Sequence, residues 1–156
     1  MESALLGVVL DSSVAIEAEL RRLNATELLR QLAARFGDCE IALSAISVAE
    51  LAHGIHRATT PERYRTRREF LDDLKAAVPV YPIRAETAEL AGKIGAESAR
   101  RGIVIPFDDL LIGVIALERG YAVATCNTRH FEKIPGLVVV SWPAPQPLPP
   151  VRSTTL

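Results

Sequence analysis

The chain has 156 residues, 49% of them hydrophobic, and its formal net charge is −1 at pH 7. These values suit one domain with a hydrophobic core, and they exclude the global basic field that would mark a nucleic-acid partner. Cys39 and Cys126 match no metal or disulfide spacing, no signal peptide opens the chain, and no apolar run approaches the ~20 residues of a membrane span. We therefore expect a soluble cytoplasmic protein with no membrane partner.

The first third of the chain is predicted to alternate strands with helices. Residues 5–13, LLGVVLDSS, contain a short apolar strand that ends at Asp11, and residues 40–45, EIALSA, form a second strand. Residues 13–37 between them are helical, with a break near Asn24.

The middle of the chain is predicted to be mostly helical. Residues 46–58 have apolar positions at helical spacing, which predicts a broad buried stripe that includes Ala49. Residues 61–77 form a polar helix, and residues 84–101 form another that ends before a glycine. Residues 78–83, VPVYPI, contain too much proline for a central strand, so an edge strand or an extended link fits them.

The last third of the chain returns to alternating elements. A further helix begins after Pro106, and residues 121–127, YAVATCN, form a third central strand. Residues 130–134 are a short helix or turn, and residues 136–142 are a final strand. The proline-rich residues 143–156 are predicted to be an extended, mobile tail.

This alternation predicts the fold class. Strands separated by helices favour a three-layer α/β/α sandwich with a mostly parallel central sheet, formed by residues 1–142 as a single domain. In such folds the ligand crevice lies at the carboxyl ends of the strands. Polar residues that directly follow strands are therefore the candidates for function.

Two such residues follow central strands. Asp11 follows GVVL, where an aspartate is often only the N-cap of the next helix, but Ser12 and Ser13 can cap equally well. Asn127 follows AVAT, where an asparagine is usually a turn former, although its amide oxygen can also orient a water molecule or a metal-bound group.

Glu50 lies at the border of the apolar face of its predicted helix. The positions three and four residues later hold His53 and Gly54, so no lysine or arginine is available as a helical neighbour. A half-buried carboxylate needs a partner, and a cation from elsewhere, such as a metal ion, would satisfy Glu50.

Asp108 and Asp109 begin the helix that follows Pro106. Capping explains one of them but not both equally, because neighbouring residues on a helix point about 100° apart. Asp109 shares a face with Gly113, a residue that is unfavourable inside a helix and suggests close approach to the sheet or room for a ligand. We therefore expect Asp109 to face the strand ends, and Asp108 to cap the helix or to support the site.

These residues jointly predict a cation site. Three or more carboxylates that converge in a partly buried crevice repel each other, which raises the pKa of at least one of them. A divalent cation relieves that repulsion, and oxygen ligands without histidine or cysteine suit Mg²⁺ or Mn²⁺.

The segments that carry these residues resemble a known family. The three segments VVLDSSVAIE, SAISVAELAHGI and IPFDDLLIGVIALERGYAVATCNTRHFEKIPGLVVVSW are similar to the PIN-domain ribonucleases, and most similar to the VapC-type toxins of bacterial toxin–antitoxin pairs. The resemblance covers residues ~7 to 142, and its last segment is the most specific. It implies that Asp11, Glu50 and Asp109 hold a Mg²⁺ or Mn²⁺ ion.

The resemblance also implies roles for the neighbouring residues. Asn127 stands where many relatives carry a fourth acid and many toxins carry asparagine, and Thr125 matches a small hydroxyl residue that helps to hold the site. Ser12 and Asp108 are supporting residues. Asp108 is also an alternative to Asp109 as the third metal ligand.

The activity implied by the resemblance is metal-dependent endonucleolytic cleavage of cellular RNA. The implied partners are a second copy of the chain and a small VapB-like antitoxin that lays a segment across the active-site groove. Arg129 and Arg100 are candidate contacts to RNA phosphates. The arginines of residues 63–68, RYRTRR, can grip RNA, contact the antitoxin or form a solvated face, and we interpret His130 as structural.

Two other functions are compatible with parts of the pattern. A phosphoacceptor signalling domain also carries aspartates at strand ends, but it needs an acidic pair after the first strand, where this chain has Asp11 followed by two serines. A non-catalytic binding module with the PIN fold would act through antitoxin or RNA contacts alone. The clustered carboxylates argue against such a module, because a pure binder has no use for them.

Overall fold

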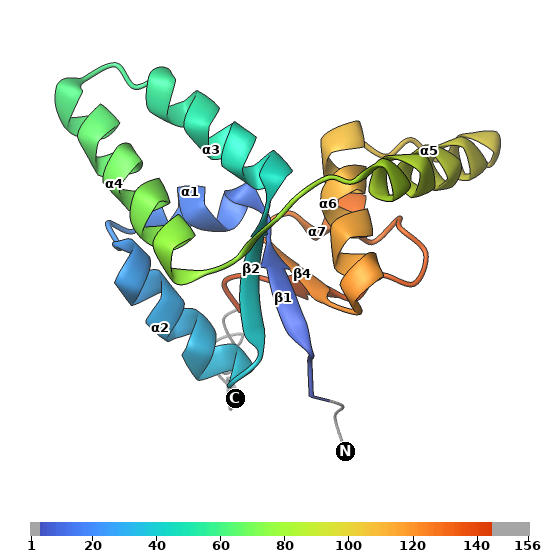
Figure 1. Ribbon diagram of the computed structural model, residues 1–156, viewed down its shortest axis with the longest axis horizontal. Helices are drawn as coiled ribbons and strands as arrows, with labels where there is room; N and C mark the ends of the chain where they lie inside the picture. Colours follow the sequence, from blue (N-terminus) through green and yellow to red (C-terminus); the bar gives the residue numbers. More distant parts are fainter. Residues whose placement is uncertain (1–3, 145–156) are drawn as a thin grey trace, which may run out of the picture.

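The computed structural model describes residues 4–144 as a five-stranded sheet with helices on both faces (Figure 1). All pairings are parallel, in the order β3-β2-β1-β4-β5. The strands are β1 (Gly7–Leu10), β2 (Glu40–Ser44), β3 (Val80–Tyr81), β4 (Ala122–Thr125) and β5 (Val139–Ser141). The predicted tail lies, from residue 145 onward, outside the described residues.

The helices divide between the two faces of the sheet. They are α1 (Ser12–Leu20), α2 (Ala25–Phe36), α3 (Ala45–His56), α4 (Pro61–Ala77), α5 (Ala85–Arg100), α6 (Phe107–Arg119) and α7 (Thr128–Phe131). Figure 1 shows α1 to α4 on one side of β1 and α5 to α7 on the other. This arrangement confirms the predicted three-layer α/β/α sandwich.

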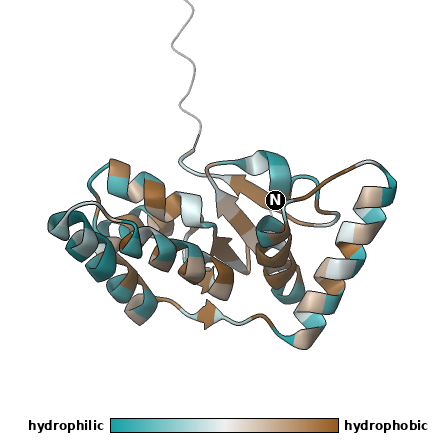
Figure 2. Cartoon of the chain, turned by 90° about the horizontal axis from the view of Figure 1, so that it is seen from above, coloured by the Kyte–Doolittle hydropathy of each residue, from teal (hydrophilic) through white to brown (hydrophobic). Residues whose placement is uncertain are grey.

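Two hydrophobic cores hold the layers together. Val8 and Leu10 of β1 enter the core shared with α1, α2 and α4, whereas Val9 enters the core shared with α5, α6 and α7. Successive strand residues point to opposite faces, so a strand covered on both faces must be apolar throughout. Figure 2 shows the strands and the helix beside them as mostly hydrophobic.

The local signals for helix ends are confirmed. Asn24 separates α1 from α2 and caps α2, because its side chain accepts a hydrogen bond from the backbone N–H of Glu27 and the Glu27 side chain accepts one in return. Thr60 caps α4 by accepting from the backbone N–H of Arg63. The proline-flanked residues 80–81 form β3, at the edge of the sheet.

The predicted buried stripe of α3 is wrong in part. Ile55 is buried, but Ala49 is exposed and the other apolar positions are only partly covered. The reason is that α3 packs mainly on α4 and extends past the sheet, as Figure 1 shows. Within residues 4–144, no helix combines the length and apolar character that crossing a bilayer requires.

Candidate active site

Asp11 lies at the carboxyl end of β1 and is held there by two hydroxyl groups. Its Oδ2 accepts hydrogen bonds from Ser13 Oγ at 2.7 Å and from Thr125 Oγ1 at 2.9 Å. Thr125 is the last residue of β4, which pairs with β1, so the sheet itself brings the two side chains together. Asp11, a residue that is 8% exposed, stands at the N-cap position of α1 but makes no side-chain capping bond, so its carboxylate is available to the site.

Ser13 is a part of this arrangement that the sequence interpretation missed. Besides its bond to Asp11, its Oγ accepts a hydrogen bond from the backbone N–H of Cys126 at 3.0 Å. Ser13 therefore ties the start of α1 to the segment after β4. The Ser-Ser pair after Asp11 was the available signal, but only Ser12 was predicted to support the site, and Ser13 was interpreted as a possible helix cap.

Glu50 approaches the site from α3. Ser12 Oγ donates to Glu50 Oε2 at 3.0 Å, and Ser47 Oγ of the same helix donates to the backbone carbonyl of Leu10 at 3.1 Å. The pKa of Glu50 is raised, mainly by partial burial of its carboxyl group and further by the negative charges of Asp11, Asp108 and Asp109, while the bond from Ser12 opposes the rise. Glu50 nonetheless remains exposed to solvent.

Asp109 approaches from the first turn of α6. Its Oδ2 lies 2.7 Å from Nδ1 of His130, on the short helix α7. The pKa of Asp109 is also raised, first by burial and then by the charges of Asp11 and Asp108, against the lowering effect of His130. The upward direction agrees with the sequence prediction at both Glu50 and Asp109, but burial contributes more than the predicted repulsion between carboxylates. His130, set aside as structural, is the second residue that the sequence interpretation missed.

The expected capping role of Asp108 is wrong. Pro106 occupies the N-cap position of α6 and the helix has no side-chain capping bond, so Asp108 is an exposed first-turn residue. The interpretation of Gly113 also needs correction. A Cβ on Gly113 would collide with the Ile134 side chain and lie 3.2 Å from Leu137, so the glycine admits the segment after α7 and not the sheet or a ligand.

The remaining candidates occupy more open positions. Asn127 is the exposed N-cap residue of α7, where its side chain makes no capping bond. Arg129 is exposed in the same helix, next to the site. Arg100 is the exposed last residue of α5, and Figure 1 shows that helix extending away from the sheet. Cys39 and Cys126 are free thiols, as predicted.

The donor chemistry of the site fits a hard divalent cation. Asp11, Glu50 and Asp109 offer carboxylate oxygens, and the pKa values of Glu50 and Asp109 are raised, first by burial and further by the charges of the neighbouring carboxylates. In their present positions, no three histidine, cysteine or acidic side chains among residues 4–144 converge enough to hold an ion directly. Mg²⁺ usually keeps several waters and needs only one or two protein carboxylates, so the residues fit an ion held in part through water.

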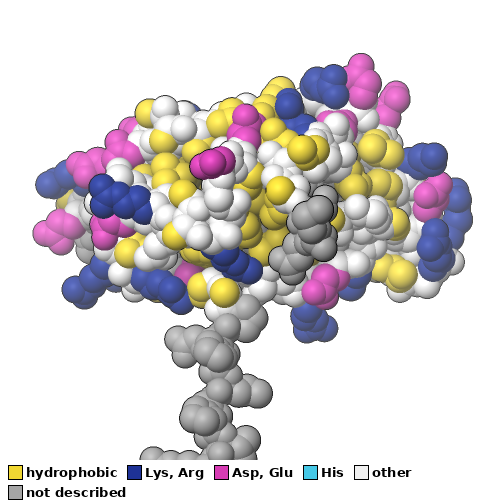
Figure 3. Space-filling model, turned by 90° about the horizontal axis from the view of Figure 1, so that it is seen from below, with side chains coloured by type: hydrophobic (Ala, Val, Ile, Leu, Met, Phe, Trp, Pro, Cys, Tyr) yellow, Lys and Arg dark blue, Asp and Glu magenta, His cyan; other side chains and the backbone are white. Residues whose placement is uncertain are grey.

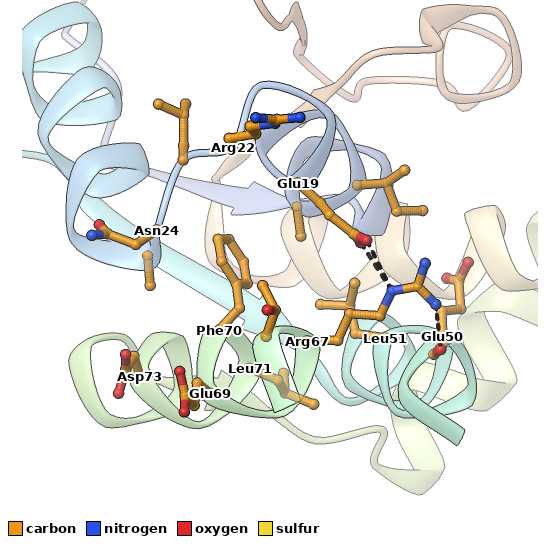
Figure 4. Close-up of a pocket in the computed structure, with 16 residues that line it drawn as sticks. Glu19, Arg22, Asn24, Glu50, Leu51, Arg67, Glu69, Phe70, Leu71 and Asp73 are labelled. Atoms are coloured by element: carbon orange, nitrogen blue, oxygen red, sulfur yellow. Dashed lines mark hydrogen bonds and ion pairs between the residues drawn. The ribbon is translucent and has the colours of Figure 1, made fainter. Parts of the chain in front are cut away.

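A groove of about 470 Å³ lies between α1, α2, α3 and α4 and includes Glu50 in its lining (Figure 4). Glu50 lines one end, and Phe70 and Asp73 of α4 line another part. Arg67 crosses the groove, with its Nε bonded to Glu19 and its Nη1 donating to the carbonyl of Gly54 at 2.8 Å.

The arginines of residues 63–68 therefore differ in whether they pair with other groups or point into solvent. Arg67 is engaged inside the groove and Arg68 pairs with Asp72 at 2.7 Å along α4, whereas Arg63 and Arg65 are exposed. Figure 3 shows charged side chains of both signs toward the ends of one face, with hydrophobic atoms in its middle. The described residues on that face therefore mix both signs of charge.

Comparison with known proteins places this geometry in a family. The model of the PIN domain matches residues 8–137, which is most of the chain. The chain is a VapC-type PIN-domain protein. It is 34% identical over 108 residues to the tRNA(fMet)-specific endonuclease VapC of Salmonella typhimurium, which covers 64% of this chain and 74% of that protein.

Further VapC relatives match over nearly their whole length. Ribonuclease VapC2 of Haemophilus influenzae is 27% identical over 138 residues, or 88% of this chain and 99% of the relative. The crystal structure of DNA-bound VapBC from Salmonella typhimurium contains a chain with 27% identity and a TM-score of 0.73, covering 88% of this chain and 99% of that one. The PIN fold, and with it the predicted family, is confirmed.

Proposed function

We propose that this VapC-type protein is a metal-dependent endoribonuclease that acts as the toxin of a type II toxin–antitoxin pair in the cytoplasm. The observation that carries the proposal is the set of three carboxylates at one edge of a PIN sheet, two of them with raised pKa values. An ionised cluster of this kind is unfavourable by itself and becomes favourable when a cation binds. The relatives named as VapC endonuclease and ribonuclease support the same chemistry.

In this proposal Asp11, Glu50 and Asp109 hold one Mg²⁺ or Mn²⁺ ion, directly or through water. The ion would lower the pKa of a bound water and stabilise charge on the scissile phosphate. Thr125 and Ser13 keep the Asp11 carboxylate in position through their hydroxyl groups. Ser12 does the same for Glu50.

The substrate side of the site is assigned to exposed residues. Asn127 orients the attacking water or the phosphate with its amide group, and Arg129 contacts a flanking phosphate. Arg100 remains a candidate for a more distant phosphate. In-line attack by the water leaves a 5′-phosphate and a 3′-hydroxyl on the two RNA fragments.

Cleavage of a structured RNA, such as bulk tRNA, by the purified protein tests the proposal. We expect cleavage with Mg²⁺ or Mn²⁺, none with EDTA, and none with the Asp11→Asn variant. Equal cleavage by the Asp11→Asn protein would contradict the proposal. A folded wild-type protein that binds RNA without cutting it in either metal would favour the non-catalytic binding module.

The groove beside Glu50 is the proposed binding place of a VapB-like antitoxin. Its walls combine apolar surface with charges of both signs, which suits a peptide segment of mixed character. Ile16, which is 51% exposed on α1, lines the groove. An Ile16→Arg variant should bind the product of the adjacent antitoxin reading frame at least about tenfold more weakly, an effect on the order of 1.4 kcal/mol.

A matched control for the groove is Val138→Arg, an equally exposed apolar position outside it. This variant should bind the antitoxin as the wild type does. Equal losses of affinity in both variants would place the antitoxin elsewhere. The homodimer implied by the resemblance stays a prediction, which the solution mass of the purified chain can check.

A further inference from the structure

The contact between His130 and Asp109 is the strongest feature that the proposed chemistry leaves unused. His130 Nδ1 lies 2.7 Å from Asp109 Oδ2, and the two residues are 21 positions apart in the sequence. An ionised carboxylate can only accept hydrogen bonds, so Nδ1 is the donor in this pair. Among the described residues, no hydrogen bond engages the other oxygen, Oδ1 of Asp109.

The packing of α7 on α6 fixes the distance between the two residues. Phe131, next to His130, is buried in the core that α6 shares, and Ile134 fits against the bare Cα of Gly113. Gly113 lies one helical turn after Asp109 on α6. The same interface therefore sets both the depth of α7 and the reach of the His130 ring toward Asp109.

We propose that His130 is a positioning residue that donates from Nδ1 to Oδ2 of Asp109 and so leaves Oδ1 oriented for the divalent cation. This inference rests on the metal-dependent function proposed above. Carboxylates that bind metals usually also accept a hydrogen bond from a neighbouring group. Loss of that group typically weakens metal affinity about 10–100-fold. Without His130, the Asp109 carboxylate would rotate among several orientations, and the cation would have to select one of them.

The test measures Mn²⁺ binding by the free-Mn²⁺ electron paramagnetic resonance signal, without RNA. His130→Phe keeps a ring of similar size but has no donor, and we expect its Kd for Mn²⁺ to rise at least about tenfold. His130→Asn places an amide nitrogen the same number of bonds from Cα as Nδ1, so its Kd should stay within about threefold of wild type. The amide of His130→Gln reaches one bond farther and should not restore the affinity.

His56→Phe is the matched control, because His56 is exposed and forms an edge-on aromatic pair with Tyr64, which phenylalanine can also form. It should bind Mn²⁺ as the wild type does. In cleavage assays, the Mn²⁺ concentration for half-maximal rate should rise in His130→Phe by the same factor as the Kd. Thermal unfolding in EDTA verifies that each variant is folded.

The Mn²⁺ affinities of these variants either support or overturn the positioning role of His130. Weak binding by His130→Phe with recovery in His130→Asn supports the positioning role. Wild-type affinity in His130→Phe, or equally weak binding in His130→Phe and His130→Asn, overturns it while leaving the proposed function intact. A wild-type protein that binds no Mn²⁺ overturns the proposed function, and this inference with it.

Discussion

The sheet-borne carboxylate and the helix-borne carboxylates of the site are held in different ways. Asp11, the sheet-borne one, is buried and accepts two hydroxyl hydrogen bonds on one oxygen, from Ser13 and Thr125. Glu50 and Asp109, the helix-borne ones, each have one side-chain hydrogen-bond partner among residues 4–144 and more access to solvent. The site thus has one carboxylate held by two hydroxyl groups just after β1, and we expect the two side chains on α3 and α6 to adjust when a cation binds.

Both helix-borne carboxylates have raised pKa values. Partial burial raises the pKa of Glu50 and of Asp109, and the hydrogen bond from Ser12 or His130 offsets only part of that rise. The metal-free site therefore carries unfavourable charge in its adjustable part. Cation binding would remove that cost, so the helix-borne carboxylates should respond to both metal and pH.

The largest expected effect comes from replacing the fixed carboxylate. Asp11→Asn should lower the rate of RNA cleavage about 10³-fold, because a metal supplies several kcal/mol of transition-state stabilisation and about 1.4 kcal/mol is a factor of ten. Glu50→Gln should lose less, about 10²-fold, because an exposed side chain is more easily replaced by water. Single-turnover cleavage at saturating Mn²⁺ measures both rates, and a larger loss in Glu50→Gln would reverse the proposed division.

The hydrogen bond from Thr125 to Asp11 should matter more for RNA cleavage than its contribution to the stability of the fold alone would explain. Thr125→Val removes the donor to Asp11 Oδ2, so it should lower the free energy of unfolding by about 1–2 kcal/mol and cleavage about 10–100-fold. Thr87→Val is the matched control, because Thr87 is equally buried and donates to Glu118 away from the site. It should cost similar stability with cleavage within about twofold of wild type. Denaturant unfolding and cleavage rates measure the two quantities, and equal losses of activity would refute the support role.

The pH dependence of metal binding should report the helix-borne carboxylates. Their pKa values are raised, so protons compete with the cation at a higher pH than they would at ordinary carboxylates. The Kd for Mn²⁺ should be constant at neutral pH and rise as pH falls, by up to about tenfold per pH unit for each proton displaced. Calorimetric titration between pH 8 and pH 5 measures this, and a Kd that does not change across the range would contradict it.

The smallest expected effect is on the metal-free stability. A carboxyl group whose folded-state pKa is raised destabilises the fold when it is ionised, and this cost disappears as pH falls through that pKa toward the unfolded value of about 4. Glu50→Gln and Asp109→Asn should therefore raise the free energy of unfolding at pH 7 in EDTA, by less than about 1 kcal/mol. The gain should be absent below about pH 4. Urea unfolding at both pH values measures it, and destabilisation at pH 7 would show that the ionised groups are stabilising.

The sequence was sufficient for the fold because its signals were local. The apolar runs of β1 and β4, the cap at Asn24 and the proline pair around β3 each depend on a few neighbouring residues. Because the carboxyl ends of parallel strands meet at one edge of the sheet, Asp11 and Asn127 were also predicted to lie at that edge. The length of α3 beyond the sheet was not predictable, because it depends on packing against α4.

Side-chain pairing within the site could not be predicted from the sequence. The bond between His130 and Asp109 depends on how deeply α7 packs on α6, which Gly113 and Ile134 decide. The bonds of Ser13 likewise require the register of β1 and β4. Asp108 and Asp109 are adjacent in sequence, and only the direction of α6 distinguishes the exposed one from the one that contacts His130.

The most direct test of the central claim is the melting temperature of the metal-free protein as Mn²⁺ is added. A ligand at a hundredfold excess over its Kd stabilises the folded state by about 2.7 kcal/mol, which for a chain of this size is a rise of about 5 °C or more. We expect that rise in the wild type, and none in Asp11→Asn or Asp109→Asn. A wild-type melting temperature that does not change at millimolar Mn²⁺, or a rise of equal size in all three proteins, would contradict the account.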